Sequence, residues 1–255
     1  MPMSKSDLDR SMRVLRLSGM LASLDARALQ VTSNEVSFMD AFMMLVQDEL
    51  DRRQSRLLER RFSQSGLKEK KTFHEINWGF NPKLPKKIIL ELGVLKFIDA
   101  RENVLLIGSP GTGKSHVAKS LALSAINGGY KVFYREAHDL IAEIHSAREL
   151  GELPRYRSQL RGAELLIIDD LFLRKLPATA GEDLAEVLMT RYERASTIVT
   201  SNRPIADWGA LLGDVVVASP LLDRMLHHGH LLKFDGPSWR LSESASRLAK
   251  NVASS

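Results

Sequence analysis

The sequence predicts an α/β fold, in which a mostly parallel sheet is flanked by helices and preceded by a small N-terminal helical domain. Short apolar runs that suit β-strands alternate with helical stretches from Asn103 onward, and this alternation is typical of parallel sheets. A glycine-rich turn directly follows the first run, whereas the residues before position 66 show helical periodicity instead. The five runs are residues 104–107, 132–134, 165–168, 197–200 and 231–234.

Length and composition narrow the classes of protein to consider. A chain of 255 residues can bury one α/β core and leave a smaller unit beside it. The absence of cysteine excludes disulfides and thiolate metal sites. We expect a cytoplasmic protein with no membrane contact, because no apolar stretch reaches spanning length and the N-terminus is polar. His116, His227 and His228 lack partners at ligand spacing, so structural or surface roles are expected for them.

The N-terminal region is expected to form helices that lead into a basic band. Apolar residues at helical spacing occur in residues 8–17 and again in residues 38–50, with interruptions at Gly19 and at residues 32–34. Residues 51–71 then hold eight basic residues against three acidic ones, in a chain of net charge +5. This band is consistent with contacts to DNA phosphates and equally with a solvated helix face. The arginines considered for DNA contact are Arg52, Arg53, Arg56 and Arg60.

The residues between the helical region and the first strand have the composition of a connector. Residues 66–85 break the helical pattern, yet they include Phe73, Trp78 and Phe80, which indicates that the segment packs on something. The sequence therefore predicts a connector that packs on the α/β core. The predicted boundaries are 1–66 for the helical domain, 67–100 for the connector, 101–245 for the α/β domain and 246–255 for a C-terminal tail.

The glycine-rich turn matches the P-loop pattern, in which backbone N–H groups and the start of the next helix surround phosphate groups. Glycines let the backbone approach the phosphates closely, and the lysine of the pattern reaches the β- and γ-phosphates. The following helix carries Val117 and Leu121 on one face and has a stop signal at Gly128 and Gly129. The candidate nucleotide-binding residues are Gly108, Ser109, Pro110, Gly111, Thr112, Gly113, Lys114 and Ser115, with His116 directly after them.

A second apolar strand ends in the acids Asp169 and Asp170, at the edge of a parallel sheet where ligands bind. We expect Asp169 and the Ser115 hydroxyl to hold Mg²⁺, and Asp170 to orient or activate the attacking water. Asp170 is also consistent with a helix N-cap or with a second acid for the metal. Because aspartate is one methylene shorter than glutamate, slow hydrolysis is expected.

Two more polar residues are candidates for the same site. Asn202 follows the strand at 197–200, where an amide can hold water or sense the γ-phosphate, but it is equally consistent with a turn former. Arg224 lies in a helical stretch, where a simple pairing with Asp223 or solvent is the alternative to a catalytic role. Strand position alone does not decide between these readings.

These motifs belong to a wider set of short segments, which are residues 108–115, 169–170, 191–193, 200–204, 208–209, 223–224, 227–228 and 236–240. Together they resemble the AAA+ family and, within it, the IstB-type transposition helper ATPases, over nearly the whole chain. The resemblance implies an AAA+ P-loop NTPase core, with Asn202 as the sensor-1 residue and Arg224 as an arginine finger supplied to a neighbouring subunit. It also gives Arg240 a sensor-like role, although the chain ends too soon for a full helical lid. Phe172 stands where a glycine is usual after the acids.

IstB-type proteins work beside an integrase-like, IstA-type transposase in bacterial insertion sequences, and the resemblance implies the same for this chain. It implies ATP and Mg²⁺ as ligands, slow ATP hydrolysis stimulated by assembly on DNA, and a homo-oligomer that depends on nucleotide and DNA. It further implies remodelling of duplex target DNA and recruitment of the transposase. In related initiators the stretch after the second strand faces nucleic acid, although a solvated surface fits equally here. The candidates in that stretch are Arg148, Arg155, Arg157 and Arg161.

Three alternatives share the P-loop. A DnaC-like helicase loader has the same ATPase core but favours single-stranded DNA. A nucleotide switch that scaffolds DNA without hydrolysing ATP is favoured by the short Asp170. A small-molecule kinase would need an acceptor pocket and would form a phosphorylated product.

Overall fold

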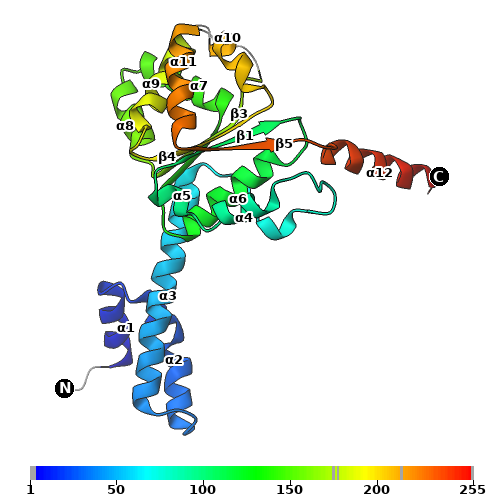
Figure 1. Cartoon of the computed structure of the whole chain (residues 1–255). Helices are drawn as coiled ribbons and strands as arrows, with labels where there is room; N and C mark the ends of the chain where they lie inside the picture. Colours follow the sequence, from blue (N-terminus) through cyan, green and yellow to red (C-terminus); the bar gives the residue numbers. More distant parts are fainter. Residues whose placement is uncertain (1–3, 174–175, 177, 213–214, 254–255) are drawn as a thin grey trace. The chain divides into compact units, whose positions relative to one another are not determined.

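The computed structural model describes residues 4–173, 176, 178–212 and 215–253 (Figure 1). The chain divides into two compact units, Met1–Arg61 and Phe62–Ser255. The first unit is helical, and the second contains the sheet and the P-loop.

The first unit consists of α1 (Lys5–Val14), α2 (Ser18–Thr32) and most of α3 (Phe38–Ser65), which runs on into the second unit. A capping box starts α1, because the Asp7 N–H donates to Ser4 Oγ at 3.2 Å and the Ser4 N–H donates to the Asp7 carboxylate at 3.3 Å. These elements confirm the predicted N-terminal helices.

Gly19 has a different role from the predicted interruption, because the break between α1 and α2 falls at residues 15–17 and Gly19 is the second residue of α2. A Cβ on Gly19 would lie 2.6 Å from the backbone oxygen of Asp48, so glycine allows α2 and α3 to approach closely. The Gly19 N–H donates to Glu49 Oε2 at 2.6 Å, and Arg53 Nε donates to Glu49 Oε1 at 2.6 Å. The Arg53 hydrogen bond is the main reason that the pKa of Glu49 is lowered.

The second unit is built around a five-stranded sheet in which every pair of neighbouring strands is parallel. The strands are β1 (Asn103–Gly108), β2 (Val132–Glu136), β3 (Leu165–Leu171), β4 (Ser196–Ser201) and β5 (Gly229–Phe234). Each predicted apolar run lies inside one of them. The spatial order β2-β3-β4-β1-β5 confirms the predicted α/β class and places β4 between β1 and β3.

Helices cover both faces of this sheet, because alternate residues of a strand point to opposite sides (Figure 1). Leu105 packs in one apolar cluster, whereas its neighbours Val104 and Leu106 pack in the other. The first face is covered by α7 (Ala137–Glu149), α8 (Leu153–Arg161), α9 (Ala178–Arg191), α10 (Trp208–Leu212) and α11 (Val215–His227). The second is covered by α4 (Lys86–Leu92), α5 (Lys96–Asp99) and α6 (Lys114–Asn127).

The segment before β1 is part of the second unit. Leu67, Leu84 and Ile89 are buried in the same cluster as Val104 of the sheet. One short element, η1 (Phe73–Glu75), precedes α4 in this segment. The large apolar residues of the connector thus lie against the α/β core.

Two further elements flank the carboxyl ends of β4 and β5. η2 (Ile205–Asp207) leads from β4 into α10, and α12 (Trp239–Ala253) follows β5. Across the parts of the chain that the structure describes, no helix combines the length and the apolarity that crossing a bilayer requires.

Candidate nucleotide-binding site

The carboxyl ends of three adjacent strands carry the polar residues that the sequence singles out. The P-loop follows β1, Asp169 and Asp170 lie near the end of β3, and Asn202 follows β4. Because β4 lies between β1 and β3 and all three are parallel, these segments meet at one edge of the sheet.

The P-loop has a backbone conformation that requires glycine. Gly111 and Gly113 have φ angles of 77° and 102°, in the left-handed region. Gly111 also has no room for a side chain, since a Cβ there would lie 2.1 Å from Ser238 Oγ. The helix α6 starts directly at Lys114, so its first, unpaired N–H groups lie at the loop. A loop followed at once by a helix N-terminus is a ready anion-binding site.

Lys114 is nearly buried at the base of the loop, with 4% of its surface exposed. Its ammonium group donates to the backbone oxygens of Gly108 at 2.8 Å and Ser109 at 2.7 Å. Burial lowers the pKa of Lys114 to about 8, although the charges of Asp170 and Asp169 act in the opposite direction. A phosphate group at the loop would favour the charged ammonium, so the residue is suited to binding polyphosphate.

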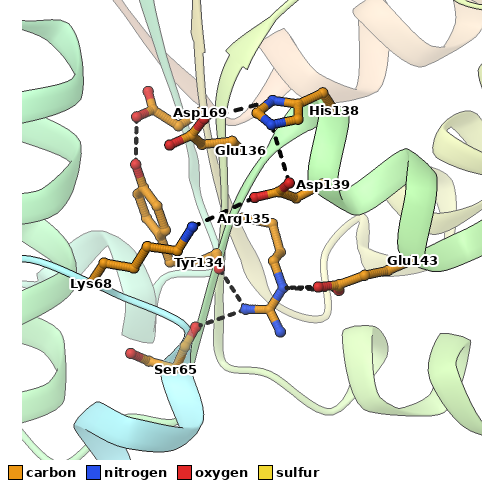
Figure 2. Close-up of polar contacts among 9 residues, drawn as sticks. All are labelled: Ser65, Lys68, Tyr134, Arg135, Glu136, His138, Asp139, Glu143 and Asp169. Atoms are coloured by element: carbon orange, nitrogen blue, oxygen red, sulfur yellow. Dashed lines mark hydrogen bonds and ion pairs between the residues drawn. The ribbon is translucent and has the colours of Figure 1, made fainter.

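Asp169 is held in place from both neighbouring strands. One carboxylate oxygen accepts a hydrogen bond from the Tyr134 hydroxyl on β2, which Figure 2 shows, and the other accepts from the Thr200 hydroxyl on β4. Only 2% of Asp169 is exposed. Its carboxylate and the Ser115 hydroxyl are oxygen donors of the kind that Mg²⁺ prefers.

A β-bulge turns Asp170 toward the loop side of the sheet edge. Residues 165–168 of β3 pair in register with residues 196–199 of β4, but Leu171 pairs with Ser201, so β3 contains one extra residue. Asp170 has a φ of 55°, and its N–H donates to Thr200 Oγ1 at 2.8 Å. Burial, and next the charge of Asp169, raises the pKa of Asp170.

A cavity of about 730 Å³ opens at this edge of the sheet. Its walls include Ile76 and Phe80 of the connector, Asp170 after the bulge, and Trp239 and Arg240 at the start of α12. Apolar walls with a few convergent charged groups, in a volume of this size, are typical of sites for nucleotides and other small ligands. The P-loop and the connector therefore both line one site.

Asn202 carries an unpaired polar atom and is one of the residues beside this cavity. Its side chain lines the cavity, and its Oδ1 is buried without a hydrogen-bond partner among the described residues. Buried side-chain oxygens are nearly always paired in native proteins, so an orphaned one that lines a cavity indicates a ligand or an ordered water.

The cavity brings together most of the nucleotide-site residues expected from the sequence. Those that line it are Pro110, Gly111, Thr112, Gly113, Lys114, Ser115, His116, Asp170, Asn202 and Arg240. Gly108 and Ser109 lie behind them as acceptors for Lys114, and Asp169 is buried beside Asp170.

Arg224 lies elsewhere, on the exposed surface of α11. Its Nη1 donates to the sulfur of Met189 at 2.8 Å, and its guanidinium lies 5.8 Å from the centroid of the Tyr192 ring. Arg224 is not one of the described residues that line the cavity. Within one chain the structure therefore does not bring this arginine to the P-loop.

Two parts of the site have no clear signal in the sequence. Nothing in the motifs marks Tyr134 and Thr200 as the partners of Asp169, although both lie at the carboxyl ends of strands that flank β3. The apolar content of the connector predicts packing, but not that Phe80 lines the cavity and meets Trp239 edge to face at 4.9 Å.

The candidate DNA-contacting arginines of α3 differ in their contacts within the chain. Arg52, Arg56 and Arg60 are exposed, and no ion pair is found for them among the described residues. Arg53 instead pairs with Glu49 and so contributes to the packing of the helical unit. The three exposed arginines are the better candidates for an intermolecular contact.

The second set of arginines lies on α7 and α8. Arg148 and Arg157 both bind Asp183 Oδ1, at 2.5 Å and 3.1 Å. Arg155 and Arg161 are exposed on α8. Asp183 therefore competes with any external anion for two of these four arginines.

Known proteins resemble this chain in sequence over most of its length. The family model of the IstB-like ATP-binding proteins matches residues 10–247. A protein of insertion sequence IS21 from Pseudomonas aeruginosa, named for ATP binding, is 36% identical over 88% of this chain and 85% of its own length. A similarly named protein of insertion sequence IS5376 from Geobacillus stearothermophilus is 34% identical over 90% of this chain and 91% of its own length.

Solved structures support the fold. The DnaC helicase loader superposes with a TM-score of 0.50 and 19% identity, over 58% of this chain and 87% of that one. The replication initiator DnaA bound to AMPPCP and single-stranded DNA superposes with a TM-score of 0.58 and 21% identity, over 72% of this chain and 56% of that one. The parallel sheet, its strand order and the P-loop at its carboxyl edge define the second unit as an AAA+ P-loop domain. The chain belongs to the family of IstB-like ATP-binding proteins.

Proposed function

We propose that this chain binds ATP with Mg²⁺ in the cavity at the P-loop and hydrolyses it slowly, as the helper ATPase of an insertion sequence. The observation that carries this proposal is the convergence of the P-loop, the bulged Asp170 and Asn202, whose Oδ1 is unpaired, on one cavity of about 730 Å³. Names of relatives that combine an insertion sequence with ATP binding agree with it.

Each residue of the site has a role that follows from its position. The N–H groups of residues 110–115 and the Lys114 ammonium would bind the phosphates. Ser115 and Asp169 would hold Mg²⁺, which offsets phosphate charge when bound. Asp170 would orient the attacking water and accept its proton, and Asn202 would hold that water through its free Oδ1. Arg240, which lines the cavity at the start of α12, would contact the nucleotide.

Assembly would complete the site. Arg224 lies outside the cavity of its own chain and is exposed, so a second subunit is the natural recipient of its guanidinium. We propose that residues 1–66, which carry the basic band, serve DNA binding and oligomerisation, and that residues 101–245 form the ATPase domain. In this scheme an oligomer on duplex DNA remodels the target and recruits an IstA-type transposase in the cytoplasm.

The DNA part of the proposal is tested by reversing the three exposed arginines of α3. The triple variant Arg52→Glu, Arg56→Glu and Arg60→Glu should bind unrelated duplex sequences more weakly, because backbone contacts carry no sequence information. The slope of log Kd against log salt concentration should become shallower by up to about 2.7, because each lost phosphate contact removes about 0.9. Fluorescence anisotropy over a salt series measures both effects. Arg53 is left intact because it pairs with Glu49.

A matched control separates a local contact from the loss of net charge. Reversing Lys83, Lys87 and Lys96 to glutamate also changes the net charge by −6, from +5 to −1, on exposed residues of the second unit. This control should bind duplex DNA more tightly than the α3 variant does. Equal DNA affinity in the α3 variant and the wild type would show that the basic band is a solvated helix face without DNA contacts. Tighter binding of single strands than of duplex by the wild type would favour a helicase loader.

A further inference from the structure

Two imidazoles and a carboxylate meet at the amino-terminal edge of the sheet, opposite the edge that carries the P-loop. Glu193 lies in the turn between α9 and β4, His227 ends α11, and His228 links α11 to β5. One ligating atom from each of these three residues lies within 4.8 Å of the other two. All three side chains are exposed, so an ion can reach them from solvent.

The backbone holds the two segments of this cluster together. The Asn103 N–H donates to the His228 backbone oxygen at 3.0 Å, and Arg101 Nη1 donates to the Glu193 backbone oxygen at 3.1 Å. Both segments are therefore attached to the entry of β1. The helix ends between the two histidines, and their ring centroids lie 4.0 Å apart. This convergence comes from the fold, since neighbouring residues within a helix do not face the same side.

The orientation of His227 leaves one nitrogen available. Its Nδ1 lies 2.9 Å from the Tyr192 hydroxyl. With Nδ1–H donating to that hydroxyl, Nε2 carries the free electron pair that a metal ion needs. A hydrogen bond to the second ring nitrogen is the usual way in which proteins orient a metal-binding histidine. His228 Nε2 lies 3.8 Å from Glu193 Oε1, so modest side-chain adjustment brings both onto one ion.

The sequence spacing gives His227 and His228 no metal-binding partner, but the fold brings Glu193 to them. We propose that Glu193, His227 and His228 form a site for a divalent transition metal of the Zn²⁺ type, with water in the remaining position. Two imidazoles and one carboxylate suit zinc and its neighbours rather than Mg²⁺, which prefers oxygen ligands. The site is separate from the nucleotide cavity and does not depend on the proposed function. It lies beside Arg224, because Tyr192 contacts both His227 and the guanidinium of Arg224.

A second cluster among the described residues provides the comparison. Glu136, His138 and Asp139 also lie close together (Figure 2). There the single imidazole directs Nδ1 to Glu136 at 3.6 Å and Nε2 to Asp139 at 3.1 Å, so its nitrogens face two different carboxylates. The Lys68 ammonium lies 3.9 Å from Asp139 and competes with a cation for it. This cluster is better described as a network of ion pairs.

The test is zinc binding by protein without a polyhistidine tag, measured by calorimetry, with Co²⁺ absorption to report imidazole ligands. Wild type and His138→Ala should each bind one Zn²⁺ per chain with equal affinity. His227→Ala, His228→Ala and Glu193→Gln should bind it more than about tenfold more weakly, and Tyr192→Phe about tenfold more weakly. Circular dichroism checks that these surface variants stay folded.

Three results would overturn the proposal. The first is no zinc binding by the wild type, and the second is unchanged affinity in His227→Ala and His228→Ala. The third is loss of binding in His138→Ala with binding retained in His228→Ala, which would move the ion to the other cluster. Because none of these measurements uses ATP or DNA, they do not depend on the outcome for the proposed ATPase.

Discussion

Arg224→Ala is expected to bind ATP almost as the wild type does and to hydrolyse it about 10³ to 10⁵ times more slowly, as for loss of an arginine finger. The loss corresponds to about 4 to 7 kcal/mol of barrier. The physical reason is that Arg224 is exposed and absent from the residues found to line the cavity of its own chain, so it would act on a neighbour. Phosphate release measured with duplex DNA, next to nucleotide binding by calorimetry, separates the two effects.

Mixing two inactive variants tests whether the arginine acts between subunits. Lys114→Ala should fail to bind ATP tightly, because it removes the ammonium that lies at the P-loop, but it keeps its own Arg224. In a mixture with Arg224→Ala, some interfaces would combine a sound P-loop with an intact arginine, and activity should partly recover and rise with protein concentration. Co-assembly without any recovery, or normal hydrolysis by Arg224→Ala alone, would show that Arg224 is no finger.

Arg191→Leu is expected to lower the free energy of unfolding by about 3 kcal/mol or more, since each buried polar group left unpaired costs about 1–3 kcal/mol. Arg191 is 1% exposed, and its guanidinium donates to the backbone oxygens of Leu160, Ala163 and Ser196 and to Thr197 Oγ1. Burial lowers the pKa of Arg191 to about 10, so the charge itself is costly there. The three carbonyls remain buried after substitution but lose their donor, and the cost of leaving them unpaired outweighs the relief from removing the buried charge.

The measurement is urea unfolding followed by tryptophan fluorescence, because all three tryptophans belong to the second unit. Arg194→Leu, an exposed position in the following turn, is the matched control and should change stability by less than about 0.5 kcal/mol. Arg191→Lys should resemble the leucine variant, since an ammonium cannot make the forked contacts of a guanidinium. A leucine variant as stable as the control would refute the assigned role.

The fold follows from the sequence because its signals are local. Each strand is a short apolar run, and the P-loop marks the strand before it and the helix after it, so five strands and their parallel arrangement are predictable. The strand order is not predictable from the pattern and comes from the structure, since pairing depends on contacts between distant segments. The position of the sites at the carboxyl edge follows directly from parallel strands.

The finer geometry of the site depends on packing that no motif encodes. Asp170 reaches the cavity through a bulge in β3, and a bulge is visible only in the register of two strands. Phe172 has a φ of 65° without being glycine. The residue is 2% exposed, and its ring meets Trp208 edge to face at 5.1 Å. Burying a phenylalanine gains about 1.5–3 kcal/mol, which offsets a left-handed backbone costing about 1–2 kcal/mol.

We propose that ATP drives assembly of this chain on duplex DNA, so that the site of one subunit is completed by the next. The most direct measurement is the mass of the protein with a duplex in solution, determined by light scattering after size exclusion, under ATP and under ADP. We predict a complex of several chains with DNA under ATP and a smaller species under ADP. The same monomer without bound DNA under both nucleotides would rule out ATP-driven assembly on DNA.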